Sequence, residues 1–309
     1  RALRAHDYDI VHVHAPRTAA MLLLASASLG RSMKNSVATL HNSWENFKPL
    51  AKPLLFVIAA SFGATVSCGR SADASMPRAL KRLAGSRWHV VQNGTDIDRV
   101  AAAIATTPAG SGRSAGRCTV SWVGRMLKRK DPLTMLDAAA SLGEDVDVVF
   151  IGDGEELPHL RAEVERRGLG GRVRLAGLLG REDVYREIAR SDVFVSTSAG
   201  EGLPVAVLEA MAVGAPVVLS DIAPHREIEA AEIRFVPVGD AAGFARAIDD
   251  VLALPAQERV ALGQLGQEAV RRTFSLEAMH AGYERVYHEL IPRRQAPDRE
   301  PTRPSASEN

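Results

Sequence analysis

The sequence has few cysteines, no long apolar run and almost no net charge. Two cysteines, Cys68 and Cys118, in 309 residues argue against a disulfide framework and suit a reducing cytosol. The longest nearly apolar run, residues 53–66, is 14 residues long, whereas a helix that spans a bilayer needs roughly 20. We therefore expect a buried helix that enters a strand. A formal net charge of +1 gives no reason to expect a nucleic-acid partner.

These absences favour a cytoplasmic protein. A hydrophobic fraction of 46% and a charged fraction of 24% are those of an ordinary globular chain. Lys48 and Lys52 lie beside the apolar run, so peripheral contact with the inner face of a membrane stays open as an alternative. The chain is longer than one average domain, which makes two domains the natural expectation.

Apolar runs of strand length alternate with helical stretches through most of the chain. We predict strands at 10–13, 37–40, 64–67, 89–92, 119–123, 146–151, 173–176, 193–196, 217–219 and 234–236. We predict helices at 17–29, 50–62, 72–83, 132–142, 156–167, 182–189, 204–213 and 241–252. This alternation is typical of the α/β class, with parallel sheets covered by helices on both faces.

One segment interrupts the alternation. Residues 106–117 contain almost no large apolar side chain, so we expect a linker there. It would separate a first Rossmann-like domain (1–105) from a second (118–274). A helix over 275–291 carries tyrosines and apolar residues on one face, and we expect it to cross back to the first domain. The polar segment 292–309 is expected to be disordered.

Two carboxylates bracket the start of one predicted helix. Gly200 and Gly202 flank Glu201, so backbone can approach a ligand closely there. Pro204 marks the start of a helix, whose free N–H groups and positive dipole end suit a phosphate. Glu209 lies farther along the same helix and could accept hydrogen bonds from ribose hydroxyls. The residues alone leave a second interpretation open, that of two solvated surface carboxylates.

A basic loop follows another predicted strand. Gly124 and Arg125 come directly after this strand, and Lys130 lies five positions beyond Arg125. The planar guanidinium and the ammonium could together neutralise a diphosphate. Because ligands of parallel sheets bind at the carboxyl ends of the strands, this loop and the carboxylate loop belong to the same edge. A solvated basic loop is the alternative.

The sequence resembles glycosyltransferase family 4, which has the retaining GT-B architecture. Residues 201–218 match its frame E-G-L-P-V-x-V-L-E-A-M-A-x-G-x-P-V-V throughout. Further agreement lies at G-R…K-D-P (124–132), I-G-D-G (151–154), P-H-R-E-I (224–228), D-I-V-H-V-H (9–14), T-L-H (39–41) and N-G-T-D (93–96). Thr95 departs from the family, which usually has a hydrophobic residue there.

The resemblance implies a role for each site residue. Glu209 would hold the ribose hydroxyls of a donor and Glu201 the transferred sugar, while Arg125 and Lys130 would hold the diphosphate. His41 would face the donor sugar across the cleft. The base of the donor would lie against Gly177 and Leu178. The remaining expected donor contacts are Gly124, Gly202, Leu203 and Pro204. Without the resemblance, a packed strand-end histidine is the favoured interpretation of His41.

The resemblance also implies the reaction. We expect transfer from a UDP- or GDP-sugar to an unknown acceptor hydroxyl on a glycan, a lipid or a small molecule, with no cofactor and no metal. His12 and His14 share a strand face, but no carboxylate or cysteine completes a metal site. A GT-B epimerase or phosphorylase, or a nucleotide-sugar-binding protein without catalysis, are the alternatives.

Family members begin with a strand and a glycine-rich loop, for which we find no equivalent before Asp9. We therefore expect a shortened first domain, with an exposed sheet edge, weak nucleotide binding and poor turnover.

Overall fold

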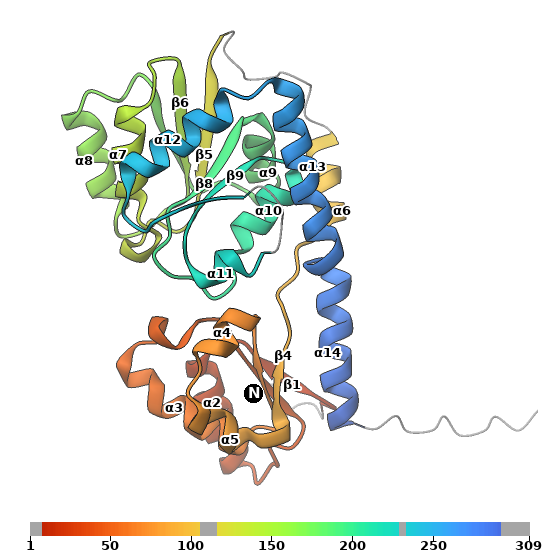
Figure 1. The fold of residues 1–309 in the computed structure, drawn as a ribbon. Coiled ribbons are helices and arrows are strands. Elements are labelled where there is room, and N and C mark those ends of the chain that lie inside the picture. Colours follow the sequence, from red (N-terminus) through yellow and green to blue (C-terminus); the bar gives the residue numbers. More distant parts are fainter. Residues whose placement is uncertain (1–7, 106–115, 229–232, 292–309) are drawn as a thin grey trace, which may run out of the picture.

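Two parallel β-sheets with helices on both faces make up the protein. The computed structural model describes residues 8–105, 116–228 and 233–291, and shows the sheets in two units, one above the other in Figure 1. The expected tail at 292–309 and most of the expected linker lie outside the described residues. The first sheet has strand order β1-β2-β3-β4, and the second has order β10-β9-β8-β5-β6-β7.

All of the predicted strands are present, with ends that differ by at most two residues. They are β1 (Val11–Val13), β2 (Ser36–Leu40), β3 (Ala64–Ser67), β4 (Trp88–Val90), β5 (Cys118–Val123), β6 (Val146–Ile151), β7 (Val173–Gly177), β8 (Val193–Ser196), β9 (Val217–Ser220) and β10 (Arg234–Val236). Each recorded strand pair is parallel. The α/β class with two Rossmann-like units is therefore confirmed.

The helices alternate with these strands. They are α2 (Pro16–Ser28), α3 (Lys52–Ser61), α4 (Arg70–Ser75), α5 (Arg78–Ala84), α6 (Ile97–Ala105), α7 (Pro132–Ser141), α8 (Leu157–Arg166), α9 (Arg181–Arg190), α10 (Val205–Val213), α11 (Ala223–Arg226), α12 (Ala241–Leu252), α13 (Ala256–Thr273) and α14 (Leu276–Leu290). Short 3₁₀ turns are η1 (Trp44–Asn46), η2 (Pro49–Ala51), η3 (Gly85–Arg87) and η4 (Lys128–Lys130).

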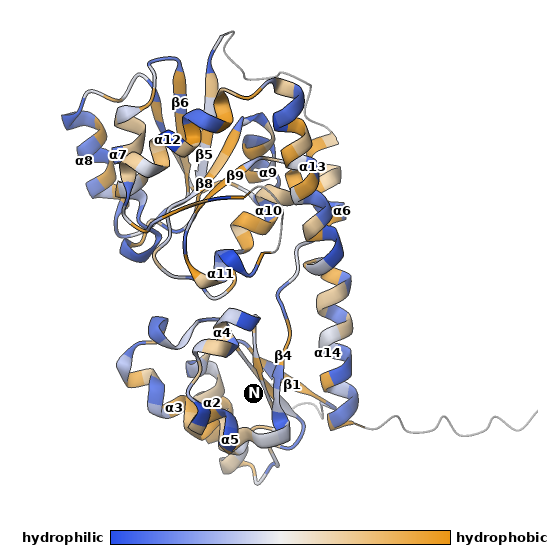
Figure 2. Cartoon of the chain, in the orientation of Figure 1, coloured by the Kyte–Doolittle hydropathy of each residue, from blue (hydrophilic) through white to orange (hydrophobic). Residues whose placement is uncertain are grey.

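The second sheet is buried on both faces, as its continuous apolar strands indicate. In β8, Val193 and Val195 pack into one cluster, with α7, α8 and α12. Phe194 points to the opposite face and packs with α9, α10 and α13. The ribbon of β8 and β9 is accordingly coloured mostly as hydrophobic in Figure 2. Alternate residues of one strand thus supply two cores, which hold the sheet between two helix layers.

One predicted helix is wrong as a single element. The stretch expected over 72–83 forms two helices, α4 and α5, because Pro77 cannot donate a hydrogen bond and restricts the residue before it. Met76 accordingly adopts an extended conformation, with φ −70° and ψ 138°. The break leaves α4 free to turn its start toward the second unit.

Helices α6 and α13 were not predicted, and both belong to the second unit. Although α6 falls within 1–105, its Val100 and Ala103 pack in the same cluster as α9 and α10. The division of the chain at residue 105 therefore does not follow the packing. In α13, Gly263 and Gly266 lower the helix propensity, and both glycines lie against neighbouring segments, Gly263 on the carbonyl of Gly214.

Helix α14 packs along one face of the first sheet. Ser275 caps it by accepting a hydrogen bond from the backbone N of Ala278 at 3.2 Å. Tyr283 and Val286 join a buried cluster with the strand residues Val37 and Val66, while α2, α3 and α5 cover the opposite face. Helices α13 and α14 together run the length of both units (Figure 1).

Replacement of Val286 by Ala should destabilise the protein by about 2 kcal/mol, because the truncated side chain leaves a cavity between α14 and the first sheet. Chemical denaturation of the whole chain measures the free energy of unfolding. Arg285→Ala is the control, since Arg285 is exposed on the same helix. Equal stability of the two variants would contradict the packing described here.

Candidate functional site at the carboxyl edge of the second sheet

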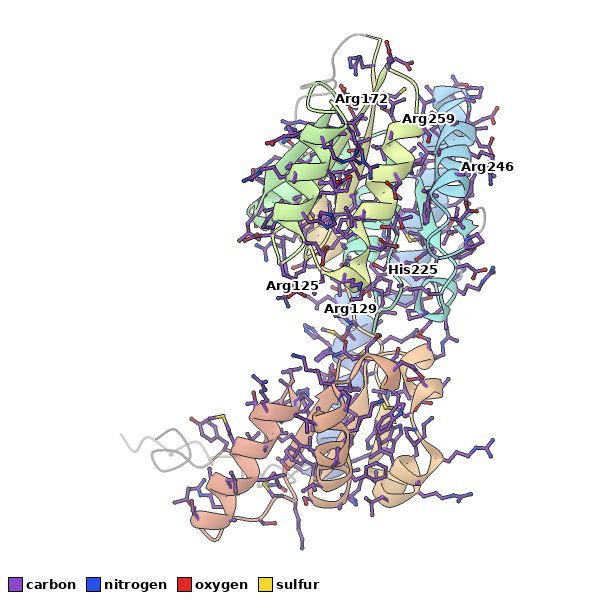
Figure 3. The ribbon with its side chains drawn as sticks, turned by 90° about the vertical axis from the view of Figure 1, so that its left-hand side faces the viewer. Arg125, Arg129, Arg172, His225, Arg246 and Arg259 are labelled. Atoms are coloured by element: carbon purple, nitrogen blue, oxygen red, sulfur yellow. The ribbon has the colours of Figure 1, made fainter. Side chains whose placement is uncertain are left out.

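Four loops follow the carboxyl ends of β5, β6, β7 and β8, which are neighbours in the second sheet. Because the strands are parallel, these loops lie at one edge, where ligands of such sheets bind. This edge faces the first unit. Arg125, Arg129 and His225 lie there in Figure 3, at the end of the second unit nearest the first.

Glu201 lies in the loop between β8 and α10 and has only 6% of its surface exposed. Its carboxylate forms an ion pair with Lys130 and accepts a hydrogen bond from Ser198 Oγ at 2.7 Å. Its backbone carbonyl accepts hydrogen bonds from the first unit, from Ser43 Oγ at 2.9 Å and Asn46 Nδ2 at 3.2 Å. A buried carboxylate is costly unless it is paired. The structure therefore brings Glu201 and Lys130 together at the boundary between the units.

Buried hydroxyls and one histidine support this loop. Ser220 Oγ donates a hydrogen bond to the carbonyl of Ser198. His225 Nδ1 lies 2.8 Å from the carbonyl of Ser220, and since a carbonyl can only accept, Nδ1 carries the proton. Burial lowers the pKa of His225 to about 4, so the ring is neutral. In the sequence His225 belongs to the motif P-H-R-E-I, and no spacing rule connects it with Glu201.

Arg125 is exposed at the start of the basic loop. Within the described residues, no hydrogen bond or ion pair is recorded for its guanidinium. The loop itself is held by backbone contact, because a Cβ atom on Gly152 would lie 1.9 Å from the carbonyl oxygen of Gly124. Arg125 and Lys130 therefore differ: Arg125 faces solvent at this edge, whereas Lys130 is paired with Glu201.

Glu209 lies in the second turn of α10 and is half-buried. Its Oε1 atom accepts a hydrogen bond from Tyr185 Oη at 2.9 Å, and Arg181 Nε lies 3.8 Å from the same oxygen. Burial raises the pKa of Glu209, while the bond from Tyr185 and the charges of Arg181 and Arg99 act in the opposite direction. Our sequence reasoning missed Tyr185 and Arg181, although their i,i+4 spacing places them on one face of α9.

Gly177 ends β7 with a positive φ of 68°, a conformation that glycine adopts readily. Its carbonyl accepts a hydrogen bond from the backbone N of Gly152 at 2.8 Å, which ties the loop after β7 to the loop after β6. Leu178 follows with 82% of its surface exposed. Both expected base-contact positions therefore lie on the ligand edge, with the Leu178 side chain in solvent.

The first unit contributes a pair of histidines. His41 follows β2, and its Nε2 atom lies 3.0 Å from Nδ1 of His14, with the two rings stacked. Burial lowers the pKa of His41, and the charge of His14 lowers it further. His12 instead hydrogen-bonds to Thr39 Oγ1 at 2.7 Å and Tyr287 Oη at 2.8 Å. His12 is thus a packed strand residue. Among the described residues, no group of three or more His, Cys, Asp or Glu side chains could hold a metal ion.

The two units touch through backbone at Gly202. A Cβ atom added to Gly202 would lie 2.0 Å from the backbone oxygen of His41, so only glycine fits there. A Cβ atom on Gly200 would meet the side-chain Oδ1 of Asn46 at 2.8 Å, a group that can move. The loop of Glu201 and the loop of His41 therefore lie in direct contact.

Glu227 makes a second set of contacts between the units. It directly follows α11, and its buried carboxylate accepts hydrogen bonds from the backbone N of Arg70 at 2.6 Å and of Ser71 at 2.8 Å. Ser71 Oγ and Gln92 Nε2 also donate to it. Glu227 thereby provides a hydrogen-bond acceptor for the free backbone N–H groups at the start of α4, which belongs to the other unit. In the sequence Glu227 belongs to the motif P-H-R-E-I, which by itself does not predict this contact.

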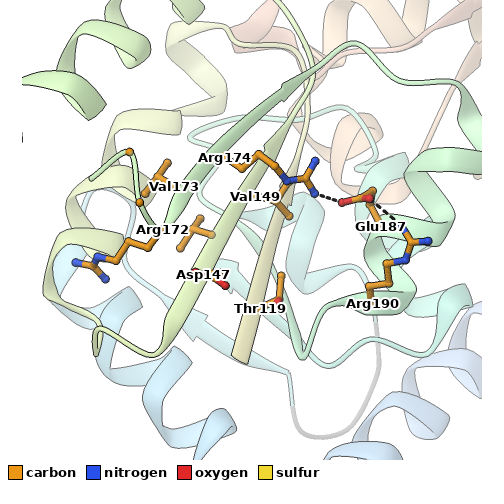
Figure 4. A pocket seen from close by; sticks show the side chains of 11 residues that line it. Thr119, Asp147, Val149, Arg172, Val173, Arg174, Glu187 and Arg190 are labelled. Carbon is orange, nitrogen blue, oxygen red and sulfur yellow. Dashed lines mark hydrogen bonds and ion pairs between the residues drawn. The ribbon is translucent and has the colours of Figure 1, made fainter. Parts of the chain in front are cut away.

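A pocket of about 530 Å³ lies at the opposite edge of the second sheet, at the amino ends of β5, β6 and β7 (Figure 4). Glu187 forms ion pairs there with Arg174 and Arg190. Arg172 donates hydrogen bonds to carbonyls at the end of α7. None of the candidate site residues lines this pocket.

Two models of known protein families match this chain. The family model described as "Glycosyl transferases group 1" matches residues 105–269, more than half of the chain, and the model "Glycosyltransferase Family 4" matches residues 1–99. The chain belongs to glycosyltransferase family 4. The resemblance inferred from the motifs is thereby confirmed.

Relatives of this family 4 chain include two named bacterial glycosyltransferases. It is 34% identical over 213 residues to the lipopolysaccharide core biosynthesis glycosyltransferase LpsE of Rhizobium meliloti, covering 67% of this chain and 61% of LpsE. It is 30% identical over 282 residues to a phosphatidyl-myo-inositol mannosyltransferase of Mycobacterium leprae, covering 86% and 70% respectively. The chain thus spans about three-fifths of the length of relatives such as LpsE.

The fold is shared with a solved structure, that of Anabaena Alr3699/HepE in complex with UDP and glucose. The TM-score is 0.80 at 20% identity, over 93% of this chain and 80% of HepE. The predicted GT-B architecture is confirmed by this likeness. In the part of the family 4 chain that the structure describes, no helix is both long and apolar enough to cross a bilayer.

Gly202→Ala should force the loops of Glu201 and His41 apart, because the added methyl group meets backbone that cannot rotate away. We expect the melting temperature to fall and the radius of gyration in small-angle scattering to rise. Gly200→Ala is the matched control, since only the mobile end of Asn46 stands in its way. If both variants behave alike, the tight contact at Gly202 is not what holds the units together.

Proposed function

We propose that this family 4 protein transfers a sugar from a nucleoside-diphosphate sugar to an acceptor hydroxyl, with the anomeric configuration retained. The observation that carries the proposal is the ion pair of the buried Glu201 with Lys130, which lies at the ligand edge of one sheet and against the loop of His41. Charged groups from one unit and a histidine from the other thus converge on one boundary. A donor held there would have its sugar at the boundary and its nucleotide on the second unit.

The diphosphate would lie between the basic loop and the start of α10. Arg125 is exposed at this edge and Lys130 reaches the loop that precedes α10. Backbone at Gly202, Leu203 and Pro204 leads into α10, whose first turn has no side-chain cap and supplies a positive dipole end. Close approach of a ligand to Gly124 would bring its phosphate oxygens within reach of Arg125.

The rest of the donor would extend to both sides of the diphosphate. Ribose hydroxyls would donate to Glu209 on α10, and the base would lie against the backbone at Gly177 and Leu178. The sugar would lie between Glu201 and His41. The pKa of His41 is lowered by burial, so near neutral pH its ring is uncharged and can exchange hydrogen bonds with sugar hydroxyls.

Charge at this site favours a diphosphate leaving group. Lys130 forms an ion pair with Glu201. A diphosphate placed between Arg125 and Lys130 would draw Lys130 toward itself, and the negative charge that grows on the departing phosphate would strengthen both contacts. These side chains would therefore stabilise the transition state more than the bound donor.

The proposed transfer breaks the bond between the anomeric carbon and the diphosphate oxygen. The acceptor oxygen forms its bond to the same face of that carbon, and the acceptor proton passes to the departing phosphate oxygen. Glu201 is held by Lys130 and Ser198, so it is not presented as a nucleophile. This supports same-face attack over a covalent intermediate.

We further infer a lipid-linked acceptor on the inner face of a membrane. The support is the name of the Mycobacterium leprae relative, which acts on a phosphatidyl-myo-inositol. Leu50, with 95% of its surface exposed between Lys48 and Lys52, also offers an apolar tip flanked by positive charge. Lys52 lies over the ring of Trp44 at 4.8 Å, which leaves Lys48 as the more available cation.

Glu209→Gln should weaken binding of the preferred nucleoside diphosphate by about tenfold, because the amide is a poorer acceptor for ribose hydroxyls than a carboxylate. Calorimetric titration with UDP, GDP and ADP identifies the base and measures the loss. Glu165→Gln, at an exposed position of α8, is the control.

The pH dependence gives a second readout of Glu209. Its pKa is raised by burial, so the carboxylate should protonate, and the wild-type advantage over Glu209→Gln should shrink, as the pH falls through a value above that of an ordinary glutamate. An advantage that stays constant down to pH 4, or a lack of binding by all three nucleotides, would refute the assignment of Glu209.

Transfer itself should require an acceptor. We expect radiolabel from a UDP- or GDP-sugar to enter the organic-extractable fraction when lipid-linked saccharides are supplied, and NMR of the product to show the donor's anomeric configuration. Transfer only to water-soluble acceptors would refute the lipid-linked proposal. Donor consumption without any acceptor would indicate an epimerase instead, and an inverted product would rule out same-face attack.

A further inference from the structure

Tyr185 is a buried tyrosine whose hydroxyl reaches the candidate donor site. It lies on α9 with 1% of its surface exposed, and its ring packs in the cluster that includes Leu208 and Met211 of α10. Its Oη atom donates to Glu209 Oε1 at 2.9 Å. A buried tyrosine hydroxyl needs a partner, and here the partner is the carboxylate expected to hold ribose.

The two oxygens of Glu209 differ in their surroundings. Oε1 accepts the hydrogen bond from Tyr185 and faces Arg181 Nε at 3.8 Å. No hydrogen bond to Oε2 is recorded from the described residues. A carboxylate has about four acceptor positions, so Tyr185 occupies one and leaves the others available. The side chain of Glu209 keeps 13% of its surface exposed, which lets a ligand reach it.

We propose that Tyr185 is a positioning residue that orients Glu209 toward both ribose hydroxyls, and that the preference of the site for ribonucleotides over 2′-deoxyribonucleotides depends on it. This inference rests on the proposed function, because it needs a nucleotide at Glu209. A freely rotating carboxylate can follow whichever hydroxyl remains, whereas a carboxylate held at one oxygen presents its other acceptor positions in one direction.

Tyr185 also helps to keep Glu209 ionised, which favours its bonds to ribose hydroxyls. Burial favours the neutral form of Glu209, and the hydrogen bond from Tyr185 opposes it by favouring the carboxylate. Arg181, one helical turn from Tyr185 on α9, also favours the carboxylate but is more than half exposed. Tyr185 is therefore the better ordered of the two supports.

Tyr185→Phe in the full chain tests the inference, since it removes the hydroxyl and keeps the buried ring. Calorimetry measures the affinity for UDP and for 2′-deoxy-UDP, or for the corresponding GDP or ADP pair if the protein prefers that base. We expect the wild type to favour the ribonucleotide and the variant to lose about fivefold or more of this preference, chiefly through weaker ribonucleotide binding.

The control variant is Tyr283→Phe. It also removes a buried tyrosine hydroxyl, one that hydrogen-bonds to Thr39 at 3.0 Å in the first unit. It should lower the melting temperature without changing the ratio of the two affinities. A purely structural Tyr185 would behave in the same way, so the ratio separates a positioning role from a stabilising one.

The double variant Tyr185→Phe/Glu209→Gln shows whether Tyr185 acts through Glu209. We expect the preference of the double variant to equal that of Glu209→Gln alone. A wild-type preference that survives intact in Tyr185→Phe, or losses that simply add in the double variant, would overturn the inference and leave the proposed function standing. A wild type without ribonucleotide preference would instead contradict the proposed role of Glu209, and the inference with it.

Discussion

The backbone contact between Gly202 and His41 is the constraint on which the arrangement of the site depends. No side chain fits between them, so the loop after β8 and the loop after β2 are in direct backbone contact. Ser43 and Asn46 then hydrogen-bond to the carbonyl of Glu201, the residue next to Gly202. Both loops follow the ends of buried strands. Because the interiors of the two sheets are closely packed, the strands hold the two loops in place where the units meet. This contact fixes the approach of the two backbone segments that carry His41 and Glu201.

Two buried carboxylates lie at the boundary between the units. Glu201 and Glu227 both lose hydration, a cost of several kcal/mol for each ion. Lys130 and Ser198 offset this cost for Glu201, and the start of α4 offsets it for Glu227. The contacts of Glu227 cross the boundary, so they are satisfied in one relative placement of the units and unsatisfied in others. Glu227 therefore selects the observed placement, whereas the Glu201 carboxylate, the proposed contact of the transferred sugar, is held by groups of its own unit.

The sequence predicted the strands and helices better than it predicted what each of them packs against. Each strand in the described part of the chain lies where one was predicted, and the central ones, such as β8, are buried on both faces and appear as continuous apolar runs. Helix α13 was missed because Gly263 and Gly266 weaken its helical signal, yet those glycines let it approach its neighbours. Helix α6 lies in the stretch we assigned to the first domain and packs on the second. Such errors arise where packing between distant segments outweighs local propensity.

By itself the sequence determined the fold class, the family and the loops that carry the candidate site, since apolar periodicity and motif order are local properties of the chain. Only the tertiary structure decided which groups meet. Lys130 and Glu201 are 71 positions apart, Tyr185 and Glu209 are 24 apart, and Glu227 reaches Arg70 across 157. Hydrogen bonds and ion pairs act over a few ångströms of space, whatever the separation along the chain. Their partners were therefore set by the packing of the two sheets, and with them the charge and orientation of Glu201 and Glu209.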